Sequence, residues 1–174
     1  YPPLPFLQAV HNAIDNSSIA LGAQNMWYEE SGAFTGETSA KMLKDVGVVS
    51  GLAGHSERRH LLGETNEIVA KKVVAGLQEG LQVVLCVGET LQQREAGETL
   101  PVVLSQVEEG LAGVELLQMD NIVIAYEPVW AIGTGKTAMP SDAQEVHTTI
   151  RSTLAVLFDE NISCLLYTSD AADE

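Results

Sequence analysis

Residues 81–90 read LQVVLCVGET, and residues 121–128 read NIVIAYEP. In both stretches an apolar run rich in β-branched residues leads to an acid, Glu89 in the first and Glu127 in the second. Short runs of this kind, bounded by Gly or Pro, are typical of strands. Runs that are apolar throughout indicate strands buried on both faces of a parallel sheet.

Two further apolar runs precede these, at residues 19–22 and 48–53. The last helix is expected to begin at Ser141, because Gln144 three positions later completes a capping box and Pro140 stands just outside. Strands and helices therefore alternate, which predicts the α/β class. The other segments with helical periodicity include residues 64–78 and 99–111.

Length and composition narrow the possible functions. The chain has 174 residues, enough for one domain, and a net charge of −15 argues against nucleic acid as a partner because phosphate binding needs a basic patch. No apolar run is long enough to span a membrane, and the start at Tyr1 lacks the features of a signal peptide. The missing initiator Met suggests that the true beginning is absent. Cys86 and Cys164 have neither metal-binding nor CxxC spacing, which predicts no metal and a cytoplasmic protein.

Polar side chains follow each predicted strand at the point where it ends. Parallel sheets are either open and doubly wound or closed into barrels, and both carry their chemistry at the carboxyl ends of the strands. We therefore expect these side chains to share one site. They are Gln24 and Asn25, His55, Gly88 with Glu89, and Glu127.

The segment YEPVWAIGTGKT, residues 126–137, has two interpretations. A phosphate-binding P-loop needs a glycine at position 130, where this chain has Trp130, so that interpretation fails. The alternative is a mobile lid, in which Trp130 and Ile132 exclude water and the amide of Gly133 reaches an anion. An ordinary connection between strand and helix is the competing explanation.

Glu127 and His55 are the two candidates for chemistry. An acid directly after an apolar strand is either a general base or a structural residue in a salt bridge, and the sequence leaves both open. His55 precedes Ser56, which is expected to begin a helix, and the N–H groups of that first turn favour a neutral imidazole able to polarise a carbonyl. A structural role is the alternative for His55. The other histidines, His11, His60 and His147, receive only the structural interpretation.

Residues 31–39, SGAFTGETS, form a glycine-containing loop that carries Phe34 and Thr35. The loop is too polar to be buried within its own subunit. We expect it either to insert into a partner subunit or to lie as a plain surface loop.

Four collinear motifs, AQN…GAFTGETSAKMLKDVG, GHSERR, VLCVGET and IAYEPVWAIGTGK, closely resemble the triosephosphate isomerase family. The resemblance covers residues 1 to about 163. It implies part of a TIM (β/α)8 barrel, about strands three to six with their helices, and an isomerase that uses neither metal nor organic cofactor.

The resemblance also implies roles for individual residues. Glu127 matches the base that moves a proton between adjacent carbons, and His55 matches the electrophile that stabilises the enediol(ate) intermediate. The substrates that the resemblance implies are dihydroxyacetone phosphate and D-glyceraldehyde 3-phosphate. Gly133 matches a lid residue whose amide contacts the substrate phosphate. Glu57 matches a buried acid near the site, and Cys86 a nearby cysteine more structural than nucleophilic.

The same resemblance implies a homodimer. Residues 31–38 match a loop that inserts into the neighbouring subunit, with Phe34 at the interface and Thr35 reaching toward the partner's active site. Glu37 and Arg58 match an ion pair across that interface.

The chain departs from the family in three places. A complete barrel takes about 250 residues, and the first-strand lysine and the phosphate loops after strands seven and eight have no counterpart here. Residues 164–174, CLLYTSDAADE, do not continue the pattern, and they back-translate to a sequencing adapter. We expect residues 1–163 to be the partial barrel and the tail to be non-native. Gly51 and Ala53 stand where the family has bulkier residues, so we expect an underfilled strand.

These departures predict that the chain alone has little or no activity. The alternative function is a non-catalytic remnant that associates with intact subunits. A different phosphate-binding barrel enzyme and a nucleotide-binding module are less favoured by the motifs.

Overall fold

The computed structural model describes residues 1–132, 137–158 and 166–167. Between successive strands of the described chain lie one or two α-helices, with short 3-10 helices between some of the elements. In order they are η1 (Leu4–Phe6), α1 (Leu7–Ala13), β1 (Gly22–Ala23), α2 (Ala40–Asp45), β2 (Ser50–Ala53), α3 (Ser56–Leu61), α4 (Asn66–Gln78), β3 (Gln82–Val87), α5 (Leu91–Glu95), α6 (Thr99–Gly110), η2 (Leu116–Asn121), β4 (Ile122–Tyr126), η3 (Val129–Ala131), α7 (Pro140–Leu157) and β5 (Leu166–Tyr167).

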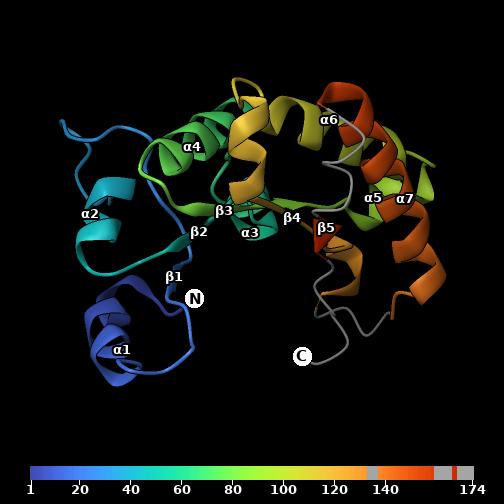
Figure 1. Cartoon of the computed structure of the whole chain (residues 1–174). Coiled ribbons are helices and arrows are strands. Elements are labelled where there is room, and N and C mark those ends of the chain that lie inside the picture. Colours follow the sequence, from blue (N-terminus) through green and yellow to red (C-terminus); the bar gives the residue numbers. More distant parts are fainter. Residues whose placement is uncertain (133–136, 159–165, 168–174) are drawn as a thin grey trace.

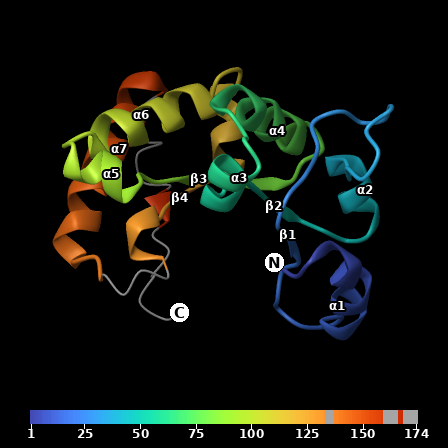
Figure 2. The same ribbon diagram turned by 180° about the vertical axis from the view of Figure 1, so that it is seen from behind.

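The strands form one parallel sheet whose spatial order follows the chain, β1-β2-β3-β4-β5. A doubly wound sheet would reverse its order at a switch point, whereas a barrel adds each strand beside the last. Figure 1 shows α4, α6 and α7 along one side of the sheet and α1 and α2 at its β1 end, and Figure 2 shows the same layer from behind. The prediction of an α/β chain forming part of a TIM barrel is confirmed.

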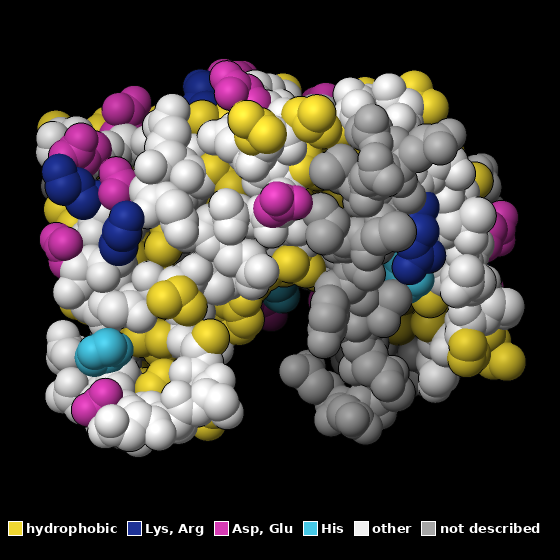
Figure 3. All heavy atoms as spheres, viewed as in Figure 1, with side chains coloured by type: hydrophobic (Ala, Val, Ile, Leu, Met, Phe, Trp, Pro, Cys, Tyr) yellow, Lys and Arg dark blue, Asp and Glu magenta, His cyan; other side chains and the backbone are white. Residues whose placement is uncertain are grey.

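Burial alternates along the strands. In β3 the side chains of Val83, Leu85 and Val87 are buried, while Val84 and Cys86 are only half-buried, and β4 alternates likewise. The buried face packs against α4, α6 and α7. The expectation of full burial on both faces is wrong for the described strands, because helices form a single layer over one face. Figure 3 shows hydrophobic side chains gathered on the described side of the hollow at the bottom of the view.

The first strand lies later than the sequence predicted. Residues 19–22 were expected to form it, but Ile19 is 65% exposed and β1 comprises only Gly22–Ala23. The backbone N–H of Ile19 instead donates to Ser17 Oγ at 3.2 Å, after a turn in which Asn16 has a φ of 64°. An apolar residue at the end of a turn has the same sequence signature as the start of a strand.

The start of α7 also differs from the prediction. Pro140 is the first helical residue and Met139 is the N-cap, so Ser141 does not cap the helix. Proline fits this first position because its missing N–H would have no helical partner there. Asp142 then accepts a hydrogen bond from the Met139 N–H at 3.0 Å.

Gly51 does not leave the underfilled strand that was expected. A Cβ at this position would lie 2.4 Å from the Cε atom of Met26, and Met26 is fully buried. The methionine therefore occupies the space that a larger side chain on β2 would take.

Leu166 and Tyr167 pair with Ile124 and Ala125 of β4 as the strand β5. Both residues belong to the tail for which a non-native origin was predicted. Strand pairing does not test whether these residues are native, so the non-native origin of residues 164–174 stays a prediction.

Candidate active site

His55 lies just beyond the end of β2 and caps α3. Its Nδ1 atom accepts a hydrogen bond from the backbone N–H of Glu57 at 3.3 Å. A ring nitrogen that accepts a hydrogen bond carries no proton, so the neutral imidazole has its N–H on Nε2. The side chain is 32% exposed. His55 can therefore donate a hydrogen bond from a defined nitrogen.

Glu127 follows β4 directly, and its backbone is held against the end of β3. Its N–H donates to the Val87 carbonyl at 3.0 Å. A Cβ on Gly88 would lie 1.9 Å from the Glu127 carbonyl oxygen, so only glycine permits this approach. Gln106 of α6 fixes Gly88 in turn, accepting from its N–H at 2.8 Å and donating to its carbonyl at 3.1 Å. The Glu127 residue is half-buried. Its backbone rests on Gly88, which Gln106 holds in place, and we call this arrangement a rigid support for Glu127.

The structure brings His55 and Glu127 to the same edge of the sheet. The strands β2 and β4 both pair with β3, so their ends are two strand spacings apart, roughly 10 Å. A cavity of about 10 Å³ beside Glu127 is lined by Ser56, Arg59 and Cys86 among others. Such a cavity holds a water molecule at most.

Cys86 and Arg59 lie behind this edge. Burial, and after it the Glu127 carboxylate, raises the pKa of the Cys86 thiol to about 12, so the thiol stays protonated at neutral pH. Arg59 donates to the carbonyls of Gly54 at 2.6 Å and Cys86 at 3.3 Å. It therefore joins the turn before His55 to β3.

A buried carboxylate, Glu89, sits behind Glu127 and is fully shielded from solvent. It accepts hydrogen bonds from Tyr126 Oη at 3.0 Å and from Trp130 Nε1 at 2.7 Å. Burial, and after it this carboxylate, raises the pKa of the Tyr126 phenol, so the phenol remains a donor. Arg94 lies 3.7 Å from Glu89 and 2.9 Å from Asp142. We call these residues the Glu89 cluster: Glu89, Arg94, Tyr126, Trp130 and Asp142.

A second charged group includes Arg58 of α3, the helix that His55 caps. Lys72 of α4 is fully buried, donates to Asn25 Oδ1 at 2.6 Å and pairs with Glu64. Glu64 also accepts from Arg58 Nε at 2.6 Å. Burial lowers the pKa of Lys72, and the Glu64 carboxylate opposes that shift. Among the described residues, Glu64 Oε2 and Trp27 Nε1 have no hydrogen-bond partner. We call Asn25, Trp27, Arg58, Glu64 and Lys72 the Lys72 cluster.

The sequence pointed to neither cluster as a unit. Glu89 and Asn25 were expected only as polar residues at strand ends, whereas Arg94, Gln106 and Lys72 were not singled out. The sequence signal that could have identified Gln106 and Lys72 is a polar residue at a position where the helical periodicity places a buried, otherwise apolar face.

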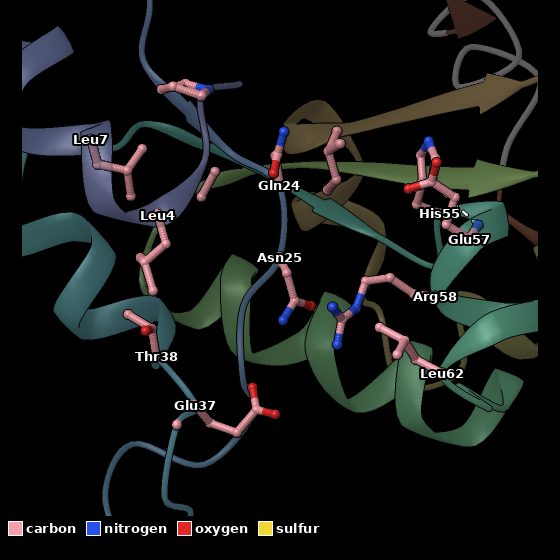
Figure 4. Close-up of a pocket in the computed structure, with 14 residues that line it drawn as sticks. Leu4, Leu7, Gln24, Asn25, Glu37, Thr38, His55, Glu57, Arg58 and Leu62 are labelled. Atoms are coloured by element: carbon pink, nitrogen blue, oxygen red, sulfur yellow. Dashed lines mark hydrogen bonds and ion pairs between the residues drawn. The ribbon is translucent and has the colours of Figure 1, made fainter.

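A pocket of about 370 Å³ opens beside α3. Figure 4 shows Asn25, Glu37 and Arg58 directed into it, with His55 and Glu57 at its other end. The Glu57 side chain is 74% exposed, so the expectation of a buried acid is wrong in this chain. Glu57 lies in the first turn of a short helix, where no described element covers it.

The loop at residues 31–38 lies on the surface. Residues 31–36 are exposed, and Phe34 packs on Trp27 with ring centroids 5.4 Å apart. Within one chain Arg58 pairs with Glu64, and Glu37 faces the same pocket. The expected pair between Glu37 and Arg58 of two subunits stays a prediction.

The lid expected at residues 126–137 is described only in part. Gly133 lies outside the described residues. Trp130 is 6% exposed and Ile132 is 37% exposed. Among the described residues, no group of three His, Cys, Asp or Glu side chains is arranged to hold a metal ion, and no helix is long and apolar enough to cross a membrane.

Comparison with known proteins gives one family. The family model described as triosephosphate isomerase matches residues 1–167. The triosephosphate isomerase of Carboxydothermus hydrogenoformans is 56% identical over 162 residues, which make up 93% of this chain and 64% of that protein. That of Treponema denticola is 52% identical over 159 residues, or 91% of this chain and 64% of that protein. The chain thus spans slightly less than two thirds of the length of these relatives.

Proposed function

Because the chain belongs to the triosephosphate isomerase family, we propose that it is the part of an isomerase that supplies the base and the electrophile for interconverting dihydroxyacetone phosphate and D-glyceraldehyde 3-phosphate. The observation that carries this proposal is the meeting of His55 and Glu127 at one edge of the sheet, with His55 Nδ1 accepting a hydrogen bond from the Glu57 N–H so that Nε2 is left as the donor. A soluble triose phosphate is the substrate, and the cytoplasm is the proposed compartment.

In the proposed mechanism, Glu127 removes a proton from the carbon next to the substrate carbonyl and returns it to the neighbouring carbon. The Nε2–H group of His55 donates a hydrogen bond to the carbonyl oxygen and then to the enediolate oxygen, which stabilises the developing negative charge. The imidazole also relays a proton between the two oxygens, so that the former carbonyl oxygen gains the proton that the former hydroxyl oxygen loses. Gly133 is the proposed contact for the substrate phosphate. Glu57 and Cys86 support the site without touching the reacting atoms.

A chimera tests this proposal. The matching region of the Carboxydothermus hydrogenoformans enzyme is replaced by this chain, so that the remainder of the barrel comes from the relative. We expect isomerase turnover, and a loss of at least about a hundredfold in Glu127→Gln because a base is removed. A folded chimera without turnover would contradict the proposal.

We further propose that the chain by itself is inactive or nearly so. The groups that are expected to bind the substrate phosphate lie outside the described site, and each such group is commonly worth about 10²-fold or more in rate. Isomerase turnover of the isolated chain within about tenfold of the chimera would contradict this.

A homodimer through residues 31–38 is the proposed assembly. The loop is exposed, and the pocket of about 370 Å³ beside α3 offers space for a partner's loop. We expect Phe34→Asp to convert a dimeric chimera to monomers in sedimentation experiments. The alternative, a remnant that only associates with intact subunits, is favoured if the isolated chain co-purifies with the relative and the chimera stays inactive.

A further inference from the structure

Arg94 of the short helix α5 contacts two stretches of chain that lie on either side of residues 133–136. Its guanidinium lies over the Trp130 ring, 4.5 Å from the centroid, and its Nη2 atom lies 2.9 Å from Asp142 Oδ1. Trp130 precedes those four residues and Asp142 follows them. Both views of the ribbon place α5 beside α7 (Figures 1 and 2).

The stretch before residue 133 is held through Glu89. The Glu89 side chain accepts from Trp130 Nε1, and its carbonyl accepts from the Val129 N–H at 3.1 Å. The same carboxylate holds Tyr126. In the sequence, Glu127 therefore lies between Tyr126 and Trp130, whose side chains both donate hydrogen bonds to Glu89. Arg94 stacks on the Trp130 ring.

The stretch after residue 136 is held through Asp142. One carboxylate oxygen accepts from the Met139 N–H at 3.0 Å, and the other pairs with Arg94. The Met139 bond and the Arg94 pair together lower the pKa of Asp142, so this carboxylate stays charged at neutral pH. The start of α7 is thus tied to α5 through one arginine.

We propose that Arg94 is a positioning residue that fixes the chain on both sides of residues 133–136 and, through Trp130 and Glu89, the Glu127 carboxylate. The role toward Glu127 as a base rests on the function proposed above. A planar guanidinium suits this position because one face stacks on the indole while an edge N–H meets the carboxylate. A lysine can form the ion pair but not the stacked contact.

Amide hydrogen exchange measured by mass spectrometry tests this proposal on the 174-residue chain without substrate. In Arg94→Met we expect exchange about fivefold to tenfold faster in both residues 127–132 and residues 139–143, since contacts of this kind are each worth about that factor or less. In Arg94→Lys we expect the increase only in residues 127–132. Arg151→Met, which removes an arginine from α7 outside the cluster, is the matched control and should change neither segment.

Two additional measurements keep the proposal falsifiable if Arg94→Met does not fold. Asp142→Asn retains an oxygen for the Met139 N–H and should speed exchange only in residues 139–143. In a Trp27→Phe background, Trp130 is the only tryptophan of the chain. Arg94→Lys should shift its fluorescence emission, and Asp142→Asn should not.

The proposal is overturned if Arg94→Lys leaves both exchange and emission unchanged, or if exchange rises equally in β4 and α6, which would indicate general loosening. Exchange is read without turnover. An inactive chimera would therefore contradict the proposed isomerase activity. The positioning of the chain by Arg94 would still be decided by the exchange measurements alone.

Discussion

Two buried carboxylates, Glu64 and Glu89, support the two candidate residues in different ways. Glu64 lies in the Lys72 cluster and faces two cations, Lys72 and Arg58. Glu89 lies behind Glu127 and is bonded mainly by neutral donors, the Tyr126 hydroxyl and the Trp130 indole.

The difference indicates different roles. A charge paired with opposite charges in the interior is costly to break, because the remaining partner is left buried and unpaired. We therefore expect the Lys72 cluster to contribute chiefly to stability. The donors of Glu89 lie on both sides of Glu127 in the sequence, so a change at Glu89 moves the candidate base first. We expect substitutions in the first cluster to change stability most and those in the second to change the position of Glu127 most.

The largest effect is expected for Lys72→Met. Removing this cation leaves Glu64 with one partner in the interior, which should lower the free energy of unfolding by about 3–5 kcal/mol. Urea denaturation followed by circular dichroism measures the loss. Lys71→Met, at the neighbouring exposed position, is the control and should leave the midpoint nearly unchanged. Adding Glu64→Gln to Lys72→Met should restore part of the loss, and an unchanged midpoint in Lys72→Met would remove the distinction between the clusters.

Gly88→Ala is expected to come next. The new methyl group would lie 1.9 Å from the Glu127 carbonyl oxygen, so the backbone must shift. We expect a loss of about 1–3 kcal/mol in unfolding free energy, together with faster amide exchange at residues 127–132. Gly110→Ala is a milder control, because its methyl group would meet only the flexible end of Leu85 at 3.1 Å. Equal effects of the two substitutions would count against a rigid support for Glu127.

Glu89→Gln should have a smaller effect on stability, about 1–2 kcal/mol, because the amide oxygen still accepts one of the two hydrogen bonds. In the chimera, however, it should lower kcat more than it changes KM, since the substrate-binding groups are untouched. Lys72→Met, assayed where it remains folded, is the comparison and should leave kcat nearly as it is. A larger loss of kcat in Lys72→Met than in Glu89→Gln would contradict the assignment of the Glu89 cluster to positioning Glu127 and of the Lys72 cluster to stability.

The smallest effect concerns His147 of α7, which packs edge-on against the Tyr126 ring at 5.7 Å and is 3% exposed. Burial, and to a lesser extent Arg151, lowers the pKa of His147 from its ordinary value of 6.5. Well above pH 6.5 the ring is neutral in both states and contributes no pH dependence. As the pH falls through 6.5 the unfolded chain binds a proton that the folded chain resists, so stability falls until the folded pKa is passed.

Urea midpoints at about pH 7.5 and about pH 5.5 measure this term, which we expect to be below about 1 kcal/mol. His147→Asn should reduce the dependence, and His11→Gln, at an exposed position, should not. If His147→Asn keeps the whole dependence, another group is responsible.

Much of the fold follows from local pattern, and the rest from contacts between distant residues. The runs ending at Val87 and Tyr126 are strands because β-branched residues recur without interruption, and those two strand ends lie where the sequence placed them. The run at residues 19–22 was predicted from the same pattern, but of that run only Gly22 belongs to β1, where it pairs with Ser50, and Ile19 is exposed just after a turn. Periodicity alone does not distinguish the two cases.

The candidate site shows the same division. His55 and Glu127 could be singled out because each follows a predicted strand, and resemblance then supplied their roles. Arg94 was not singled out, because its partners Trp130 and Asp142 are 36 and 48 positions away along the chain. Gln106 had a local signal, a polar residue on the buried side of its helix, but its hydrogen bonds to Gly88, 18 positions away, follow only from the assembled fold.

The most direct test of the account follows the substrate proton in the chimera. Dihydroxyacetone phosphate is incubated in heavy water, and deuterium at its carbon atoms is measured by NMR spectroscopy. We predict incorporation with the unsubstituted chimera, slower incorporation with His55→Gln because the base remains, and none above the uncatalysed rate with Glu127→Gln. Incorporation by Glu127→Gln at the rate of the unsubstituted chimera would contradict the assignment of Glu127 as the base.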